Sequence, residues 1–351
     1  MRHHFLSLIA LFTCAGPALA QPAHRIEAAD RQTVSATISY EIRTTKFAVS
    51  KWMVYLPDAP ELPSQHTVKT TAEPAGVLLA EKSLLARQVR YVERTVAKPA
   101  LASSIAMTFT VDATLRSRKL VELKDGEKPP AVAALTADER KYYISSTTRV
   151  DHETQAFKDW LDRKKLRLTK GEHAFDFAAR VLDVIRADYR FFYDPDEDKR
   201  ASVACKRTAT DCGGMCYLFV GALRANGVPA RLLVGRYVKP RKPGSTPADT
   251  GYENPHVRAE MFVAGVGWVP VDPTNAHASR NQKSRAFVGV DPGDLLVLHV
   301  DVDLKVTFGN EVHTAQFLQV EPYYWTDGKG TFDGRFGPSG WDVKVTPLAK
   351  K

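Results

Sequence analysis

Residues 210–219 read Thr-Asp-Cys-Gly-Gly-Met-Cys-Tyr-Leu-Phe, and they place a cysteine at the expected start of a helix. Asp211 or Thr210 can cap the free amides of the first helical turn. The partial positive charge of a helix N-terminus favours a thiolate over a thiol, and it lowers a cysteine pKa that starts near about 8.5. The stretch therefore predicts that Cys212 is a nucleophile.

Two downstream residues can supply the other groups that such a nucleophile needs. His256 begins an alternating, strand-like run, residues 264–267 have the composition of a hairpin turn, and Asp272 follows the returning strand. Neighbouring strands would bring His256 and Asp272 together. In that arrangement the imidazole takes the Cys212 proton, and the carboxylate fixes its tautomer and stabilises its positive charge.

Four blocks of the sequence, in this order, resemble the transglutaminase-like superfamily. They are the Asp-Cys helix start, the helix exit at residues 224–231, the strand at residues 256–260 and the Gly-Trp-Val-Pro-Val-Asp-Pro strand at residues 267–273. The resemblance covers roughly residues 150–280. It implies that Cys212 is the nucleophile, His256 the base and Asp272 the orienting acid. It also implies an α+β, papain-like fold in which the cysteine-bearing helix packs on an antiparallel sheet.

The sequence departs from the family pattern at two positions without losing a catalytic group. Thr210 replaces the usual Gly before the Asp-Cys pair, and Arg258 replaces the Trp two residues after the histidine. Because Arg258 is charged where the family has Trp, the polarity of the cleft, and therefore the class of substrate, is not determined by the resemblance. Taken singly, Cys212 could be a buried small hydrophobe, and His256 or Asp272 a capping or solvated residue. The joint pattern favours the triad.

The resemblance implies a cysteine-dependent enzyme that acts on amide bonds through an acyl-enzyme. Transfer of the acyl group to water would make it a peptidase or amidase, and transfer to an amine a transglutaminase. The expected partner is a protein or peptide, cell-wall peptide included. The Cys212 amide and Tyr193 are candidate oxyanion donors, although a core tyrosine explains Tyr193 equally well. The rival hypothesis is a catalytically silent envelope binding or scaffold protein with the same fold.

Residues 1–20 have the pattern of a signal peptide. A short positive start at Arg2 precedes an apolar run at residues 5–14, and Ala18-Leu19-Ala20 is a small-residue cleavage site. This pattern predicts export to the periplasm or the medium, and it is favoured over a lipoprotein interpretation of Cys14. No other stretch approaches the roughly 18 apolar residues of a membrane span, so we expect no integral membrane segment.

Removal of the leader leaves three cysteines, Cys205, Cys212 and Cys216. An odd number in an oxidising compartment means at least one free or intermolecular thiol. We expect a Cys205–Cys216 disulfide that leaves Cys212 reduced. A bridge from either residue to Cys212 is the alternative, and it would keep the enzyme latent until reduced.

Composition excludes some classes of function. The chain has 351 residues, 44% of them hydrophobic and 25% charged, as in an ordinary globular protein of two domains, and its formal net charge is +9. Its basic runs at residues 163–167 and 239–242 lack interleaved aromatics, so nucleic acid is a poor candidate partner. The acidic residues at 194–198 do not fit a calcium-binding loop, and no metal or nucleotide motif is present. No cofactor is implied.

The pattern of elements predicts two domains and an extension. Residues 21–120 are expected to form a β-rich, sandwich-like domain with strands over 33–43, 50–56, 88–94 and 105–113. Residues 121–135 are the expected linker, and 136–280 the catalytic domain, with helices over 136–143 and 172–189. Residues 281–351 are expected to add strands, one over 296–306, and to pack an aromatic tail on the catalytic domain. Sugar-stacking is the alternative use of that tail.

Overall fold

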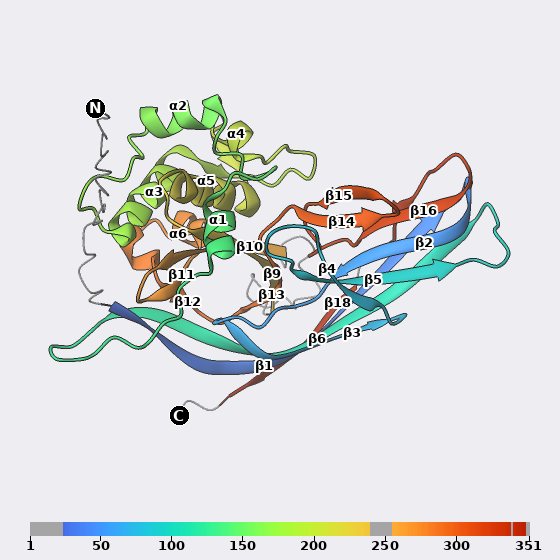
Figure 1. Ribbon diagram of the computed structural model, residues 1–351, viewed down its shortest axis with the longest axis horizontal. Helices are drawn as coiled ribbons and strands as arrows, with labels where there is room; N and C mark the ends of the chain where they lie inside the picture. The colour runs from blue at the N-terminus through green and yellow to red at the C-terminus, as the bar shows by residue number, and fades with distance from the viewer. Residues whose placement is uncertain (1–23, 239–254, 338–339, 349–351) are drawn as a thin grey trace, which may run out of the picture.

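The computed structural model describes residues 24–238, 255–337 and 340–348. Helices and mainly antiparallel strands are mixed along the chain, and this confirms the predicted α+β class. The helices gather at one end of an elongated molecule, while β1 and β6 run along its length (Figure 1). None of the helices in these ranges is long and apolar enough to cross a membrane.

A long antiparallel sheet forms the base of the molecule. Its centre is β1 (His24–Thr44) paired with β6 (Ser103–Glu122). Every second residue of β1 from Val34 to Ile42 is buried, as expected of a strand with one face on a core. The remaining strands of this sheet are β3 (Gln65–Glu73), β12 (Val290–Asp291), β17 (Arg335–Phe336) and β18 (Gly340–Pro347).

A second antiparallel sheet packs on the buried face of the first. Its strand order is β16-β2-β5-β4. Trp52 of β2 is fully buried in the same core as Ile38 and Phe109 of the long sheet. The N-terminal part is therefore sandwich-like, as expected. The strands are β2 (Phe47–Pro57), β4 (Val77–Ala80), β5 (Gln88–Thr95) and β16 (Tyr323–Gly330).

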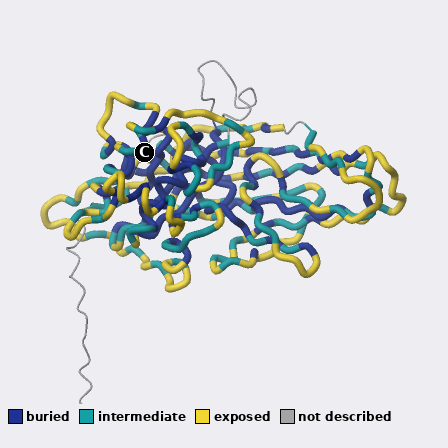
Figure 2. Tube along the Cα trace, turned by 90° about the horizontal axis from the view of Figure 1, so that it is seen from above, coloured by how far each residue is buried: buried dark blue, intermediate teal, exposed yellow. Residues whose placement is uncertain are grey.

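The helical layer surrounds α5 (Cys212–Ala225), whose residues after the first are all buried except the last. Figure 2 shows buried chain concentrated in this part of the molecule. Gly227, with φ of +73°, follows α5 and allows the chain to turn into the next strand. The other helices and the short parallel pair beside them are α1 (Ala137–Ile144), α2 (Gln155–Arg163), α3 (Ala174–Asp188), β7 (Arg190–Phe191), α4 (Ala201–Ala204), β8 (Ala209–Thr210) and α6 (Pro273–Ala278).

The helix α5 packs on a third sheet with the order β11-β10-β9-β13. The predicted hairpin forms between β10 (Pro255–Val263) and β11 (Gly267–Val271), and the Val266 amide donates to the Val263 carbonyl at 3.0 Å. Gly265 and Gly267 take positive φ angles of 77° and 93°, which suit glycine. The outer strands are β9 (Ala230–Tyr237) and β13 (Leu295–Val300).

The C-terminal segment packs on the catalytic domain only in part. Phe287, Val288 and Val302 lie in the catalytic core, and β13 joins the catalytic sheet. In contrast, β16 pairs with β2, and β17 and β18 pair with β1. Trp341 of the aromatic tail enters the core of the sandwich. These pairings occur because β1 and β2 would otherwise leave backbone donors and acceptors open along their edges.

The strand expected over residues 296–306 is two strands. Asp301 and Asp303 take φ angles of 60° and 58° and break the run between β13 and β14 (Leu304–Phe308). Aspartate tolerates this left-handed conformation better than most residues. After the break, β14 pairs with β15 (Glu311–Ala315).

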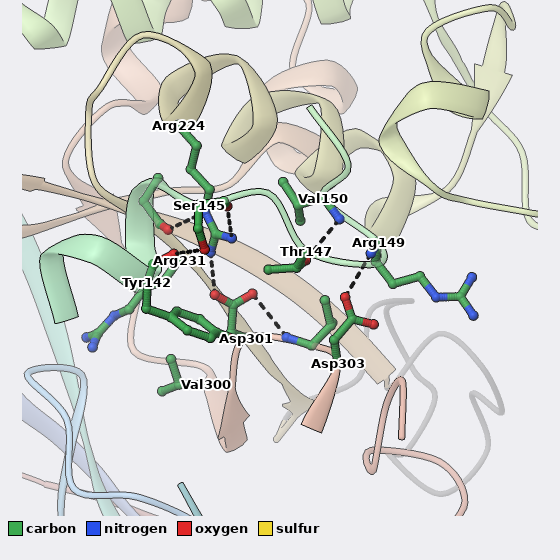
Figure 3. A network of polar contacts seen from close by, with 12 residues as sticks. Tyr142, Ser145, Thr147, Arg149, Val150, Arg224, Arg231, Val300, Asp301 and Asp303 are labelled. Atoms are coloured by element: carbon green, nitrogen blue, oxygen red, sulfur yellow. Dashed lines mark hydrogen bonds and ion pairs between the residues drawn. The ribbon is translucent and has the colours of Figure 1, made fainter. Parts of the chain in front are cut away.

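A buried arginine joins the end of α5 to the turn at residues 301–303 (Figure 3). Arg224 donates to the Ala230 carbonyl at 2.9 Å and to the Ser145 carbonyl at 3.3 Å, and it forms an ion pair with Asp301. The Asp301 carboxylate also accepts the Val302 amide at 3.0 Å. These contacts hold α1, α5 and the end of β13 together.

Candidate active site

The helix α5 begins at Cys212, as the sequence predicts, and of the two candidate caps it uses Asp211. The Asp211 carboxylate accepts the Gly214 amide at 3.1 Å, and its other oxygen lies 3.3 Å from the Lys199 ammonium. Cys212 is partly exposed, although its neighbours in the helix are buried. The candidate nucleophile therefore lies at the capped N-terminus of a buried helix.

The surroundings of Cys212 overturn the expectation of a lowered thiol pKa. Burial, together with the negative charges of Asp211 and Asp272, raises the pKa of Cys212 to about 12, although a backbone hydrogen bond from Val257 opposes the rise. The expectation considered only the helix N-terminus. It missed the desolvation of the sulfur and the charge of the capping carboxylate, and these effects are larger.

His256 and Asp272 meet, as the hairpin predicts. His256 Nε2 lies 2.9 Å from Asp272 Oδ2, and both residues are buried. Asp272 also caps α6, because its Oδ1 accepts the Asn275 amide at 2.9 Å. The Tyr237 ring stacks on the imidazole with centroids 4.5 Å apart and planes at 24°. The imidazole is thus held on its face and at one nitrogen.

Asp272 remains ionised despite its burial. Burial by itself would raise the pKa of this carboxyl group, but His256 and Arg258 together with the Asn275 amide hold it well below its usual range. A carboxylate in that state can orient an imidazole and stabilise an imidazolium.

Arg258 does not set the polarity of an open cleft, which corrects the interpretation of this family departure. Its side chain is 5% exposed and is bound by three buried carboxylates, those of Asp272, Asp291 and Asp294. No pattern in the sequence indicated a role for Asp291 or Asp294. They lie in Asp-Pro-Gly-Asp, at residues 291–294, which has the composition of an ordinary turn.

Tyr193 lies on the surface, so the alternative of a core tyrosine is wrong. Its exposed fraction is 38%, and the Lys199 ammonium lies 5.6 Å from the ring centroid. The residue before it, Phe192, is bonded to the segment that leads into α5, because its amide donates to the Thr210 carbonyl at 3.0 Å. Tyr193 is therefore on a segment that borders the start of α5.

The expected Cys205–Cys216 disulfide is not formed in this structure. Cys205, Cys212 and Cys216 are all free thiols. The Cys216 thiol donates to the Val257 carbonyl at 3.2 Å, whereas that of Cys205 lies 3.3 Å from the Ser202 carbonyl. The two sulfurs thus have backbone acceptors on separate elements. The alternative bridges to Cys212 are not formed either.

A C-terminal loop also reaches the site, which sequence reasoning missed. With its amide turned to donate, the Gln319 side-chain nitrogen lies 3.2 Å from the His256 carbonyl and 2.9 Å from the Gly235 carbonyl. The Leu318 amide donates to His299 at 3.1 Å. Gln319 is more than 60 residues from His256 in the chain, and no local pattern could have connected them. Within the described ranges, no group of His, Cys, Asp or Glu side chains is arranged to hold a metal ion.

Residues 164–273 match the family model of the transglutaminase-like superfamily. This part of the chain includes α5, the β10–β11 hairpin, Cys212, His256 and Asp272. The chain contains a transglutaminase-like domain. The resemblance that the four sequence blocks indicated is confirmed at the level of the superfamily.

Solved structures align with this chain at low sequence identity. A candidate cysteine protease from Cytophaga hutchinsonii aligns with a TM-score of 0.58 at 12% identity, over 93% of this chain and 94% of that one. The periplasmic domain of TgpA from Pseudomonas aeruginosa aligns with a TM-score of 0.34 at 12% identity, over 68% of this chain and 93% of that one. The first alignment shows that the arrangement of the whole chain, and not only of the transglutaminase-like domain, recurs elsewhere. A search among curated proteins found no match.

Proposed function

We propose that the protein is an exported thiol enzyme that acts on amide bonds of proteins or peptides. Cys212 attacks the carbonyl carbon, and the C–N bond of the resulting adduct breaks to give a thioester acyl-enzyme. His256 takes the thiol proton and passes it to the leaving amine. Water or a second amine then releases the acyl group and regenerates the thiol.

The observation that carries this proposal is the buried hydrogen bond between His256 Nε2 and Asp272 Oδ2, 2.9 Å long, beside the helix that begins at Cys212. A carboxylate at Nε2 favours the tautomer with its proton on that nitrogen. The proton from Cys212 therefore goes to Nδ1. The backbone bond from Val257, the residue after His256, to the Cys212 sulfur supports the proximity of the two side chains.

The raised pKa of Cys212 determines the resting form of the pair. With a pKa of about 12, the thiol keeps its proton at neutral pH, because burial disfavours the thiolate. The imidazole then acts as a general base during the attack, and no stable thiolate–imidazolium pair precedes it. Asp272 stabilises the positive charge that His256 gains in that step.

Two donors are proposed for the oxyanion of the tetrahedral intermediate. The first is the backbone amide of Cys212, one of the first four amides of α5, which have no partner within the helix. The second is the Tyr193 hydroxyl, on the segment that borders the start of α5. Replacing Tyr193 by Phe would then lower turnover and leave the reactivity of Cys212 towards small alkylating agents unchanged.

The proposal extends to location and substrate. The leader pattern at residues 1–20, which lies outside the described residues, supports export. The proposed substrates are therefore proteins or peptides outside the cytoplasm, cell-wall peptides included. Hydrolysis and transfer to an amine share every step up to the acyl-enzyme. The choice between them depends on which acceptor reaches the thioester.

The first test is alkylation of the three thiols by iodoacetamide, followed by mass mapping. We expect Cys212 to react faster than buried Cys205 and Cys216, and the reaction to slow about tenfold or more in His256→Ala and Asp272→Asn. His66→Ala is the matched control, because His66 is on the surface and pairs with Asp30. Equal Cys212 rates in all these variants would contradict the proposed triad.

The second test separates hydrolysis from transfer. Wild type and Cys212→Ala are incubated with casein and a fluorescent primary amine. New amino termini formed only by wild type indicate a peptidase, and amine incorporated only by wild type indicates a transglutaminase. Equal signals from wild type and Cys212→Ala in both assays would count against turnover of casein, and the alkylation result would then decide the proposal.

A further inference from the structure

Arg258 lies on the same face of β10 as His256, because residues two apart in a strand share a face. Its three guanidinium nitrogens bind three different carboxylates. Nε donates to Asp272 at 3.0 Å, Nη1 to Asp291 at 3.0 Å, and Nη2 to Asp294 at 2.5 Å. Arginine presents its donors in a rigid planar fork, so fixing two of them also fixes the third.

The contact between Arg258 and Asp272 bears directly on the proposed triad. Asp272 Oδ2 is shared between Arg258 Nε and His256 Nε2, at 3.0 Å and 2.9 Å, while Asp272 Oδ1 accepts the Asn275 amide. Both oxygens of the carboxylate are therefore held. Rotation of Asp272 away from His256 would break its bond to a guanidinium anchored on two other side chains.

The same network continues into the long sheet of the N-terminal part. Arg118 of β6 lies opposite Asp291 in the strand pairing and donates to Asp291 Oδ2 at 2.9 Å and 3.2 Å. Its Nη1 lies 2.6 Å from Glu260 Oε1 in an ion pair, and Glu260 in turn binds Arg231. All of these side chains are buried. Asp291 thus bridges Arg258 on the catalytic sheet and Arg118 on the long sheet.

We propose that Arg258 is a positioning residue for Asp272, and that Arg118 of β6 supports it through Asp291. The inference rests on the proposed function, because it assigns a role in orienting the triad. It also assigns a role to the N-terminal sheet. Through Arg118 this sheet holds Asp291, and through Asp291 it holds Arg258, so it is more than a separate binding module.

The physical reason is the cost of leaving buried charges without partners. Without Arg258, Asp272 and Asp291 each lose a cation in a site with little water, and removal of one partner from such a cluster is strongly unfavourable. The carboxylates must then move or take up protons. Either change disturbs the hydrogen bond that fixes the His256 tautomer, and a displacement of about 1 Å can cost about 100-fold in rate.

The test compares Arg258→Met and Arg118→Met with Arg224→Met. Arg224 is the matched control, because it is also buried and paired with a carboxylate, that of Asp301, outside the network described here. Histidine-labelled protein is examined by 15N NMR for the His256 Nε2–H signal, which is assigned by its absence from His256→Gln. Alkylation of Cys212 is measured in parallel.

We expect the Nε2–H signal to persist in wild type and Arg224→Met, and to be lost or shifted in Arg258→Met, with a smaller shift in Arg118→Met. Cys212 alkylation should fall up to about tenfold in Arg258→Met, no further than in His256→Ala, and recover in part in Arg258→Lys, which retains the charge but not the fork. If Arg258→Met does not fold, the spectrum of Arg258→Lys tests the inference instead. We expect a weakened His256 Nε2–H signal in that variant. A His256 signal in the Arg258 variants identical to that of Arg224→Met would overturn the inference.

This result is separable from failure of the proposed function, because the NMR signal does not depend on turnover. A protein whose Cys212 alkylation is indifferent to His256 would lack the proposed triad chemistry. Its His256 signal would still show whether Arg258 holds Asp272 in place.

Discussion

Cys212 experiences two opposing electrostatic influences at the start of α5. The helix N-terminus favours the thiolate, whereas burial and the neighbouring carboxylates of Asp211 and Asp272 disfavour it and give a thiol pKa of about 12. Asp211 therefore has two effects, since it caps the helix and also keeps the nucleophile protonated. The two effects can be separated by a change that preserves the cap and removes the charge.

Asp211→Asn is such a change, because asparagine caps helices about as well as aspartate. Loss of the negative charge lowers the pKa of Cys212, so the thiolate fraction at a given pH rises. Below its pKa a thiol's thiolate fraction changes about tenfold per pH unit. We expect the iodoacetamide rate of Asp211→Asn to exceed that of wild type from pH 7 to 9, with both rates still rising.

Asp211→Ala is the control for this experiment, because it removes the charge and the cap together and should also destabilise the protein by about 1 kcal/mol. A wild-type rate equal to that of Asp211→Asn across this pH range would show that the charge of Asp211 does not keep the thiol protonated.

At the scale of elements, the contact between β8 and α5 explains why residue 214, the second glycine after Cys212, has no side chain. A Cβ placed on Gly214 would lie 1.9 Å from Thr210 Oγ1, whereas on Gly213 the nearest atom, Asp211 Oδ1, would be 3.3 Å away. Thr210 stands where the family usually has Gly. The departure at Thr210 and the glycine at 214 are therefore coupled by packing.

We predict that Gly214→Ala lowers the free energy of unfolding by about 1–3 kcal/mol, as overpacking does, while Gly213→Ala has a smaller effect. In the background of Thr210→Gly, which removes the clashing atoms, Gly214→Ala should cost much less. Urea titrations of the four variants give this coupling energy as a double-mutant cycle. Additive effects would mean that the cost of Gly214→Ala does not come from the contact with Thr210.

For the whole molecule, the chain crosses between its two parts several times. The strand β12 pairs with β6, the buried Asp291 binds arginines of both parts, and β16 and β18 return to the sandwich after β13 has joined the catalytic sheet. Each part thus contains strands supplied by distant segments. Among the residues that the structure describes, this arrangement leaves no boundary at which one part could unfold alone with few broken contacts.

We therefore predict one cooperative unfolding transition in urea. Hydrogen exchange of peptides from β2 in the sandwich and alkylation of Cys216, which is buried in the catalytic part, should report the same midpoint. Arg118→Met should lower both midpoints together. Two separated midpoints in the wild-type protein would show that the parts are independent domains.

Local patterns in the sequence were sufficient for much of this protein. Alternation predicted the strands and the β10–β11 hairpin, and Asp211 or Thr210 before Cys212 predicted a capped start of α5. The meeting of His256 with Asp272 followed from one hairpin. These features depend on residues close in the chain, where backbone geometry and side-chain periodicity act directly.

What the sequence by itself determined is the superfamily, the α+β class and the identity of the candidate triad. Only the tertiary structure decided the partners of the C-terminal strands, the free state of the three thiols, the raised pKa of Cys212 and the bonding of Arg258 to Asp291 and Asp294. Strand pairing, desolvation and buried charge pairs depend on segments brought together from far along the chain, and no local spacing encodes which segments these are.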